Sequence, residues 1–184
     1  MQGFANVSPR LRARIAGGFL LLAMLAGGIV LSVGGGPGAA AALVAAVCWL
    51  GVTGLFYGLF RVVSESLSLI AALFSVTGLA IGVLWSLHKA PFHMSPLEFS
   101  GCYCLLTGVL IVRSVFLPRF LGVMTMAGGL GWLTFLSPQV ADVLYPWNFG
   151  AGVLGLGVLA LWLLGLGVNE RRWKEQAEAG EDWR

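Results

Sequence analysis

Six long apolar runs, separated by short polar connections, constrain the fold of this chain more than any other feature. They cover residues 15–33, 41–60, 67–87, 97–112, 118–136 and 147–168. A helix needs about 20 apolar residues to cross roughly 30 Å of hydrocarbon, and about 17 are sufficient. Strands of a membrane barrel are about half as long and alternate in polarity, which these runs do not. The pattern therefore predicts an all-α, polytopic integral membrane protein with six transmembrane helices.

The scarcity of charge favours the same class of protein. Of the 184 residues, 10% are charged and 58% are hydrophobic, and the mean hydropathy is +0.90. Soluble domains carry about 25% charged residues, so lipid must replace water over most of this surface. A net charge of +3 is too small to indicate nucleic acid as a partner. Cys48, Cys102 and Cys104 all lie inside apolar runs, where buried small side chains are expected rather than a disulfide framework.

The positions of the positive charges predict the orientation of the spans. With a cytoplasmic N-terminus, ten of the 11 Lys and Arg residues fall on the cytoplasmic side, and Lys89 alone lies outside. This distribution satisfies the positive-inside rule. The sequence thus predicts that both termini are cytoplasmic, with a basic N-terminal segment (1–14), a six-helix transmembrane domain (15–168) and a charged cytoplasmic tail (169–184).

Small residues recur every fourth position in several of the runs. This spacing lets helix backbones approach closely in a membrane, where no hydrophobic force drives helices together. The pattern does not separate packing inside one bundle from packing against another subunit. The predicted helix-packing positions are Gly54, Gly58, Gly78, Gly82, Ser100, Cys104, Gly108, Ala127 and Gly131.

Residues able to carry chemistry are few. Ionisable side chains inside a membrane are the usual markers of function, and the six runs hold almost none. His88 and His93 share one outer connection and, with Trp85, are the candidate contacts for a ligand. No cysteine or carboxylate accompanies these histidines at the spacing of metal ligands, so no metal site is predicted. Since no catalytic motif is found, we expect no enzymatic activity and no cofactor.

A second set of residues is predicted to meet lipid headgroups. Arginines at the fourth-to-fifth connection and in the tail lie on the cytoplasmic side, where anionic lipids attract them. The predicted anchors are Arg113, Arg119, Arg171, Arg172 and Trp173.

Two stretches resemble a known family. They are R-S-V-F-L-P-R-F-L-G-V-M-T-M-A-G-G-L-G-W-L-T-F-L-S-P (113–138) and W-L-L-G-L-G-V-N-E-R-R-W-K-E-Q-A (162–177). Both resemble the domain-of-unknown-function family 4386, and the basic opening R-A-R-I-A-G-G fits its usual start. The resemblance covers roughly residues 55–177 and implies a small multi-pass protein of the bacterial cytoplasmic (inner) membrane. It transfers no catalytic residue. This chain departs from the family in a shorter first outer connection and in having Leu156 where many relatives have Glu.

Two functions follow as hypotheses. The first is a non-catalytic accessory or structural subunit that packs in a larger membrane assembly or forms a homo-oligomer. The alternative is a protein that binds or carries an apolar ligand such as a lipid, a quinone or a pigment. The expected partners are the lipid bilayer and other membrane-protein subunits or a second copy of the chain, with no nucleic acid.

Overall fold

All six predicted spans are long helices in a computed structural model that describes residues 8–33, 35–86 and 95–181. The candidate spans are 18 to 24 residues long and apolar enough to cross a bilayer, and the fifth, Arg119–Leu136, extends three residues past the end of its α-helix. The fold class expected from the sequence, an all-α protein with six membrane-spanning helices, is therefore confirmed. The spans are α1 (Pro9–Ser32), α2 (Gly35–Phe60), α3 (Glu65–Ser86), α4 (Pro96–Arg113), α5 (Arg119–Leu133) and α7 (Trp147–Gly165).

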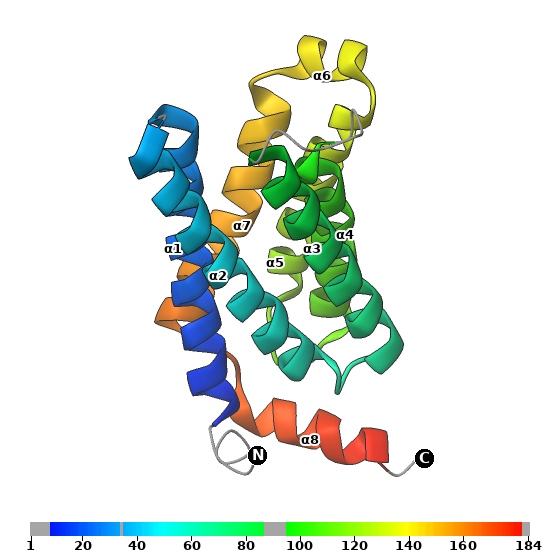
Figure 1. The fold of residues 1–184 in the computed structure, drawn as a ribbon. Coiled ribbons are helices and arrows are strands. Elements are labelled where there is room, and N and C mark those ends of the chain that lie inside the picture. Colours follow the sequence, from blue (N-terminus) through cyan, green and yellow to red (C-terminus); the bar gives the residue numbers. More distant parts are fainter. Residues whose placement is uncertain (1–7, 34, 87–94, 182–184) are drawn as a thin grey trace.

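The spans are arranged as a closed ring (Figure 1). Each helix packs against the next span along the chain, and α7 returns to pack against α1. The start of α1 and a further helix, α8 (Glu170–Glu181), lie at the same end of this bundle, which we call the terminal end. Helix α8 runs across the terminal end instead of along the spans (Figure 1).

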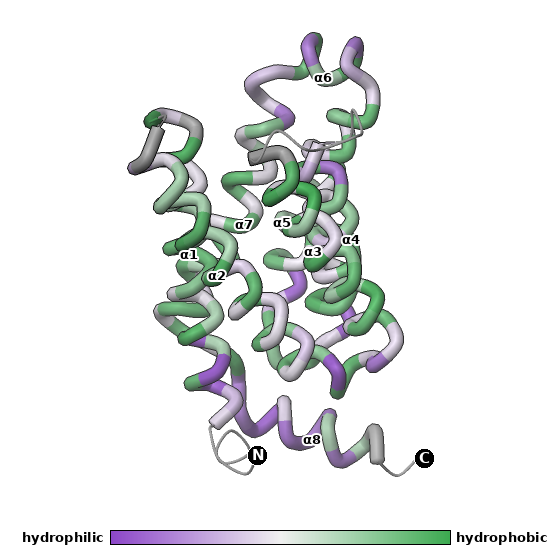
Figure 2. The backbone as a smooth tube through the Cα atoms, viewed as in Figure 1, coloured by the Kyte–Doolittle hydropathy of each residue, from purple (hydrophilic) through white to green (hydrophobic). Residues whose placement is uncertain are grey.

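Polar residues gather at the two ends of the bundle, with an apolar band between them (Figure 2). All Lys and Arg residues in the described part of the chain lie at the terminal end, on α8 or next to an end of α1, α2, α4 or α5. The opposite end carries η1 (Thr134–Leu136), at the end of the fifth apolar run, and the short helix α6 (Pro138–Leu144), in the connection between the fifth and sixth runs. The positive-inside rule, applied to this one-sided distribution, would place the terminal end on the cytoplasmic side of a membrane.

The first two helices begin earlier than their apolar runs. Helix α1 begins at Pro9, and the Ser8 side chain accepts a hydrogen bond from Leu11 N at 3.2 Å. Helix α2 begins at Gly35, although residues 34–40 lie between the first two apolar runs and were not expected to be part of a span. The N–H groups of a first helical turn need no partner within the helix, so Pro37 and its neighbouring glycines are tolerated there.

Helix α4 begins with a complete capping box. The Ser95 side chain accepts a hydrogen bond from Leu97 N at 3.2 Å, and Ser95 N donates to Glu98 Oε1 at 3.2 Å. Glu98 is buried, and its carboxylate satisfies a backbone donor that would otherwise be left open. A carboxylate in the first turn is also favoured by the positive end of the helix dipole.

The apolar core lies in the half of the bundle next to the terminal end. Its fully buried large side chains include Leu20, Val52, Leu59, Phe60, Leu110, Ile111, Leu121, Leu159 and Leu163. Helix α8 covers this half at the terminal end, where Trp173 Nε1 donates a hydrogen bond to Leu59 O at 3.0 Å. A second link joins Val115 N to Gln176 Oε1 at 3.2 Å.

Glycines bring α4 and α5 into backbone contact. A Cβ on Gly108 would lie 2.7 Å from Gly122 O, and a Cβ on Gly122 would lie 2.6 Å from Gly108 O. The pair Gly101 and Gly129 repeats this arrangement at 2.9 and 2.7 Å. Cys104 belongs to the same contact, since a Cβ on Gly129 would meet its Cβ at 3.0 Å. Small side chains are thus required along this interface, as the spacing on α4 predicted.

Other predicted packing positions divide into two groups. Gly131 packs on α7, since a Cβ there would lie 2.5 Å from Asn148 O, and Gly78 packs on α4, where a Cβ would lie 2.8 Å from Phe99 Cβ. Gly82 and Ser100 also lie at the contact of α3 with α4, where Gly82 faces Pro96. By contrast, Gly54 and Gly58 have no atom within 4 Å of a Cβ position, and Ala127 is exposed. These last three positions make no close helix contact within the described part of the chain.

Candidate functional site

A groove with a volume of about 730 Å³ opens at the terminal end. It lies between the start of α1, the α4–α5 connection, the end of α7 and the start of α8. Arg10, Arg171 and Arg172 supply positive charge to its lining, against one carboxylate, Glu170, among the described residues. The remainder of the lining is largely apolar and includes Val115, Phe116, Leu117, Pro118, Trp162, Leu166 and Val168.

The groove exists because α7 ends in a sharp turn. Leu166 N and Gly167 N both donate to Trp162 O, at 2.8 and 3.1 Å, and Gly167 has φ +70. That backbone conformation is costly for a residue with a side chain and common for glycine after a helix. The turn brings Gly167 against the side chain of Arg10, whose Cγ lies 3.0 Å from the Cβ position of the glycine.

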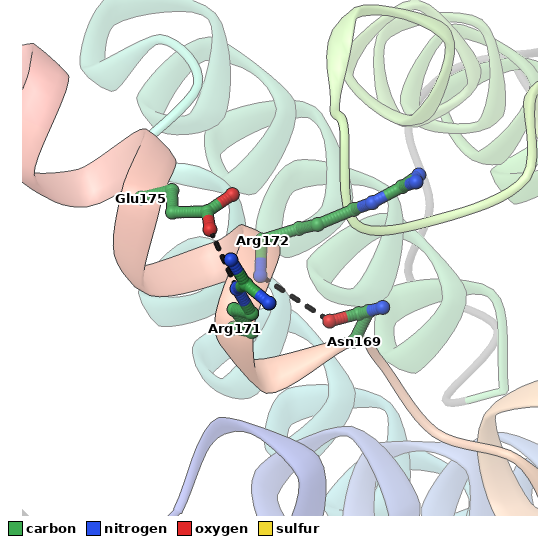
Figure 3. Close-up of polar contacts among 4 residues, drawn as sticks. All are labelled: Asn169, Arg171, Arg172 and Glu175. Atoms are coloured by element: carbon green, nitrogen blue, oxygen red, sulfur yellow. Dashed lines mark hydrogen bonds and ion pairs between the residues drawn. The ribbon is translucent and has the colours of Figure 1, made fainter.

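Asn169 then fixes the direction of α8. Its side-chain Oδ1 accepts a hydrogen bond from Arg172 N at 3.2 Å, as an N-cap residue does (Figure 3). Its backbone N donates to Phe116 O, also at 3.2 Å, which ties the start of α8 to the α4–α5 connection. The guanidinium of Arg172 reaches the same connection and donates to Val115 O at 3.4 Å. The positive end of α8 therefore faces the groove.

The headgroup anchors predicted from the sequence occupy different places. Arg171 and Arg172 line the groove, and Arg171 also pairs with Glu175 at 3.0 Å in the exposed manner of i,i+4 residues (Figure 3). Arg113 and Arg119 are exposed at the same end, outside the lining of the groove. Trp173 is half-buried against the core and holds α8 on the bundle through Leu59.

A second polar feature lies inside the membrane-spanning region, among α2, α3 and α4. Trp49 Nε1 donates to Ser75 Oγ at 2.9 Å, and Ser75 Oγ lies 2.6 Å from Thr53 Oγ1. A cavity of about 10 Å³ adjoins this cluster, and Ser68 and Tyr103, both 2% exposed, line it with hydroxyl groups that make no hydrogen bond to the described residues. Space of that size accommodates roughly one water molecule.

One of the three candidate ligand contacts lies among the described residues. His88 and His93 lie outside the described residues, and Trp85 lies in the last turn of α3. Across the described ranges, no three His, Cys, Asp or Glu side chains gather as ligands for a metal ion.

Sequence reasoning identified only Arg171 and Arg172 among the residues that line the groove, and it missed Arg10 and Trp162 in particular. In the sequence, Arg10 is one of the positive charges that indicate the orientation of the spans, and Trp162 is one residue of the sixth apolar run. The break Gly167-Val168-Asn169, between that run and the basic cluster, is the available signal for a turn that brings these residues together.

Comparison with known proteins agrees with the resemblance stated from the sequence. No curated protein and no solved structure matches the chain. A family model does match, over the end of α3, the α4–α5 hairpin and α7. The matched range includes the groove residues 115–118, Trp162 and Leu166. Residues 82–167 of this chain match the family described as a domain of unknown function, DUF4386, which confirms the family resemblance.

Proposed function

We propose that this protein is a non-catalytic component of the bacterial cytoplasmic membrane that associates with a second copy of itself through α2. The observation that carries the proposal is the exposed face of this helix. Leu43 and Val47 are each 69% exposed and Leu50 is 48% exposed, and Gly54 continues the same face one turn further. The spacing of four, three and four residues keeps all of them on one side of the helix.

The physical reason lies in what glycine does in a membrane helix. A glycine that faces lipid lowers helix propensity by about 1 kcal/mol relative to alanine and offers no side chain for packing. A glycine at a helix contact recovers that loss, because it lets two backbones meet. Gly108 and Gly122 make such a contact inside the chain, whereas the position of a Cβ on Gly54 is open. A second copy placed on this face would give Gly54 the contact it lacks.

The alternative, a carrier for a lipid, quinone or pigment inside the bundle, has less support. Binding pockets for such ligands have volumes of roughly 300–1,000 Å³. The cavity among α2, α3 and α4 measures about 10 Å³. The groove at the terminal end is large enough, but it is open and lies at the end of the spans.

Cross-linking in native membranes tests the proposal. In a background without native cysteines, Val47→Cys is expected to form a disulfide-linked dimer on mild oxidation, because a symmetric contact brings equivalent residues of two copies together. Val153→Cys is the control, since Val153 is an exposed residue of α7 on another side of the ring. Adding Gly54→Leu should abolish the Val47→Cys product. Gly150→Leu, at a glycine that is equally open but on α7, should not.

Three results would overturn the proposal. Equal cross-linking at Val47→Cys and Val153→Cys would indicate random collision, and no cross-linking at all would indicate a monomer. A stoichiometric second membrane protein, lost only with Gly54→Leu, would assign the face to a mixed assembly and not to self-association.

A further inference from the structure

We propose that the groove at the terminal end is a binding site for one anionic glycerophospholipid. The charge of the groove is the first argument. Arg10, Arg171 and Arg172 reach it from the two ends of the chain, and Glu170 is the carboxylate that opposes them among the described residues. Guanidinium groups are suited to phosphate, because they present several N–H donors in one plane.

The donors of these arginines are not used up by contacts within the protein. The Arg172 guanidinium makes one long hydrogen bond, 3.4 Å, to a backbone carbonyl. Arg171 uses its Nε on Glu175, but that pair is exposed, with side-chain exposures of 89% and 56%. Exposed pairs of this kind contribute little and are easily exchanged for another anion. The N-terminus of α8 adds its own positive end to the same space.

The apolar lining determines which phosphate compound fits. Trp162 on α7 and Leu166, the C-cap residue of that helix, line the groove, and Leu166 is 55% exposed. Farther from the terminal end, the apolar surface of α7 also includes Leu161 and Leu154, which are 61% and 63% exposed. An acyl chain can follow that surface into the bilayer while its phosphodiester lies among the arginines. A water-soluble phosphate would leave the apolar lining uncovered.

The place of the groove also favours a lipid. It lies at the end of the spans where the cations gather, which is the headgroup level of the leaflet on that side. Basic recesses between spans on this side are typical sites for anionic headgroups. A lipid bound here requires no second copy of the chain, so the site is independent of the proposed association through α2.

Native mass spectrometry of delipidated protein tests the site. The purified chain is titrated with phosphatidylglycerol and with phosphatidylcholine of the same acyl composition. We expect the wild type to bind phosphatidylglycerol about tenfold more tightly than phosphatidylcholine. One basic residue near an anionic lipid contributes roughly fivefold, and the three arginines are not expected to contribute fully at the same time. The groove variant Arg10→Gln/Arg171→Gln/Arg172→Gln should lose that preference.

A matched control carries the same change of charge. The variant Arg113→Gln/Arg119→Gln/Lys174→Gln removes three cations from the same end of the bundle, but none of them lines the groove. It should keep the preference for phosphatidylglycerol. An equal loss in both triple variants would mean a diffuse positive surface and would overturn the assignment. Should the groove triple not fold, the single variants Arg10→Gln and Arg172→Gln, both at exposed positions, give the same comparison.

A third arm separates the lipid from a soluble anion. The variant Leu166→Gln, at an exposed apolar position, should weaken the lipid and leave binding of glycerol 3-phosphate unchanged. If glycerol 3-phosphate binds as tightly as phosphatidylglycerol, the groove is a site for a soluble phosphate compound and the lipid assignment is wrong.

Discussion

The contact between α4 and α5 makes the sharpest prediction, because the same substitution should have opposite effects at two glycines. In Gly122→Ala, the new Cβ would lie 2.6 Å from Gly108 O and 3.0 Å from Val112 N, both backbone atoms of the facing helix. Real Cβ contacts essentially never fall below 3.0 Å, so the helices must separate. In Gly150→Ala, the Cβ meets nothing within 4 Å.

The magnitudes follow from two opposing effects. Overpacking costs about 1–3 kcal/mol, and alanine recovers about 1 kcal/mol of helix propensity over glycine. We therefore expect Gly122→Ala to lower the free energy of unfolding by up to about 2 kcal/mol. At roughly 2–4 °C per kcal/mol for a chain of this size, Tm should fall by up to about 8 °C. Gly150→Ala has only the propensity effect, so its Tm should stay level or rise.

A thiol-reactive dye measures this unfolding directly. Cys104 is 1% exposed and lies in the α4–α5 contact, so the dye reaches it only when the helices separate. The other two cysteines, Cys48 and Cys102, are first replaced by Ala. Adding Val112→Ala to Gly122→Ala removes a side chain from the contact but leaves the backbone atoms, so it should not restore Tm. A Tm for Gly122→Ala at or above that of the wild type would refute backbone contact between these helices.

Three further predictions concern a cap, a second helix contact and the topology. Ser95→Ala removes one half of the capping box and should lower the free energy of unfolding by about 0.5–2 kcal/mol. Amide hydrogen exchange should become faster only at the start of α4, and an equal increase along the whole chain would contradict this prediction. Gly152→Ala places a Cβ on the indole ring of Trp132, so it should lower Tm, and Trp132→Leu should restore part of the loss. Reporters fused after Ser114 and Gln139 should fall on opposite sides of the membrane, with Ser114 in the cytoplasm, and a common side would rule out the six-span topology.

The spans could be predicted from the sequence because length and apolarity alone define them. Their ends could not, because local hydrogen bonds decide where a helix begins. Ser8 caps α1 ahead of the apolar run, and the glycines after residue 34 are accommodated in the first turn of α2. In the first case a capping residue extends the helix beyond its apolar segment. In the second, the N–H groups of the first turn need no acceptor within the helix, so the helix can begin before that segment.

The helix contacts were predictable in part for a related reason. A series of small residues identifies a face, as it did for Gly108, but it does not say which residue lies opposite. The register of α4 against α5 assigns that position to Gly122, which belonged to no predicted series. Helix α5 also packs against α7 on another side, through Gly128 and Gly131, so one four-residue series cannot describe it, and Ala127 faces outward.

The groove could not be predicted because its arginines come from the first and the last helix of the chain. They meet where α7 packs against α1. This contact closes the ring and joins the two spans that are most distant in sequence. Around this closure Arg14 donates to Gly165 O at 2.9 Å, and Asn169 and Trp173 tie α8 to the α4–α5 connection and to α2. An anionic lipid that bridges Arg10 and Arg172 would add a link across the same closure. Because a ligand that binds only the folded state stabilises it, lipid binding should strengthen this contact more than any other in the ring.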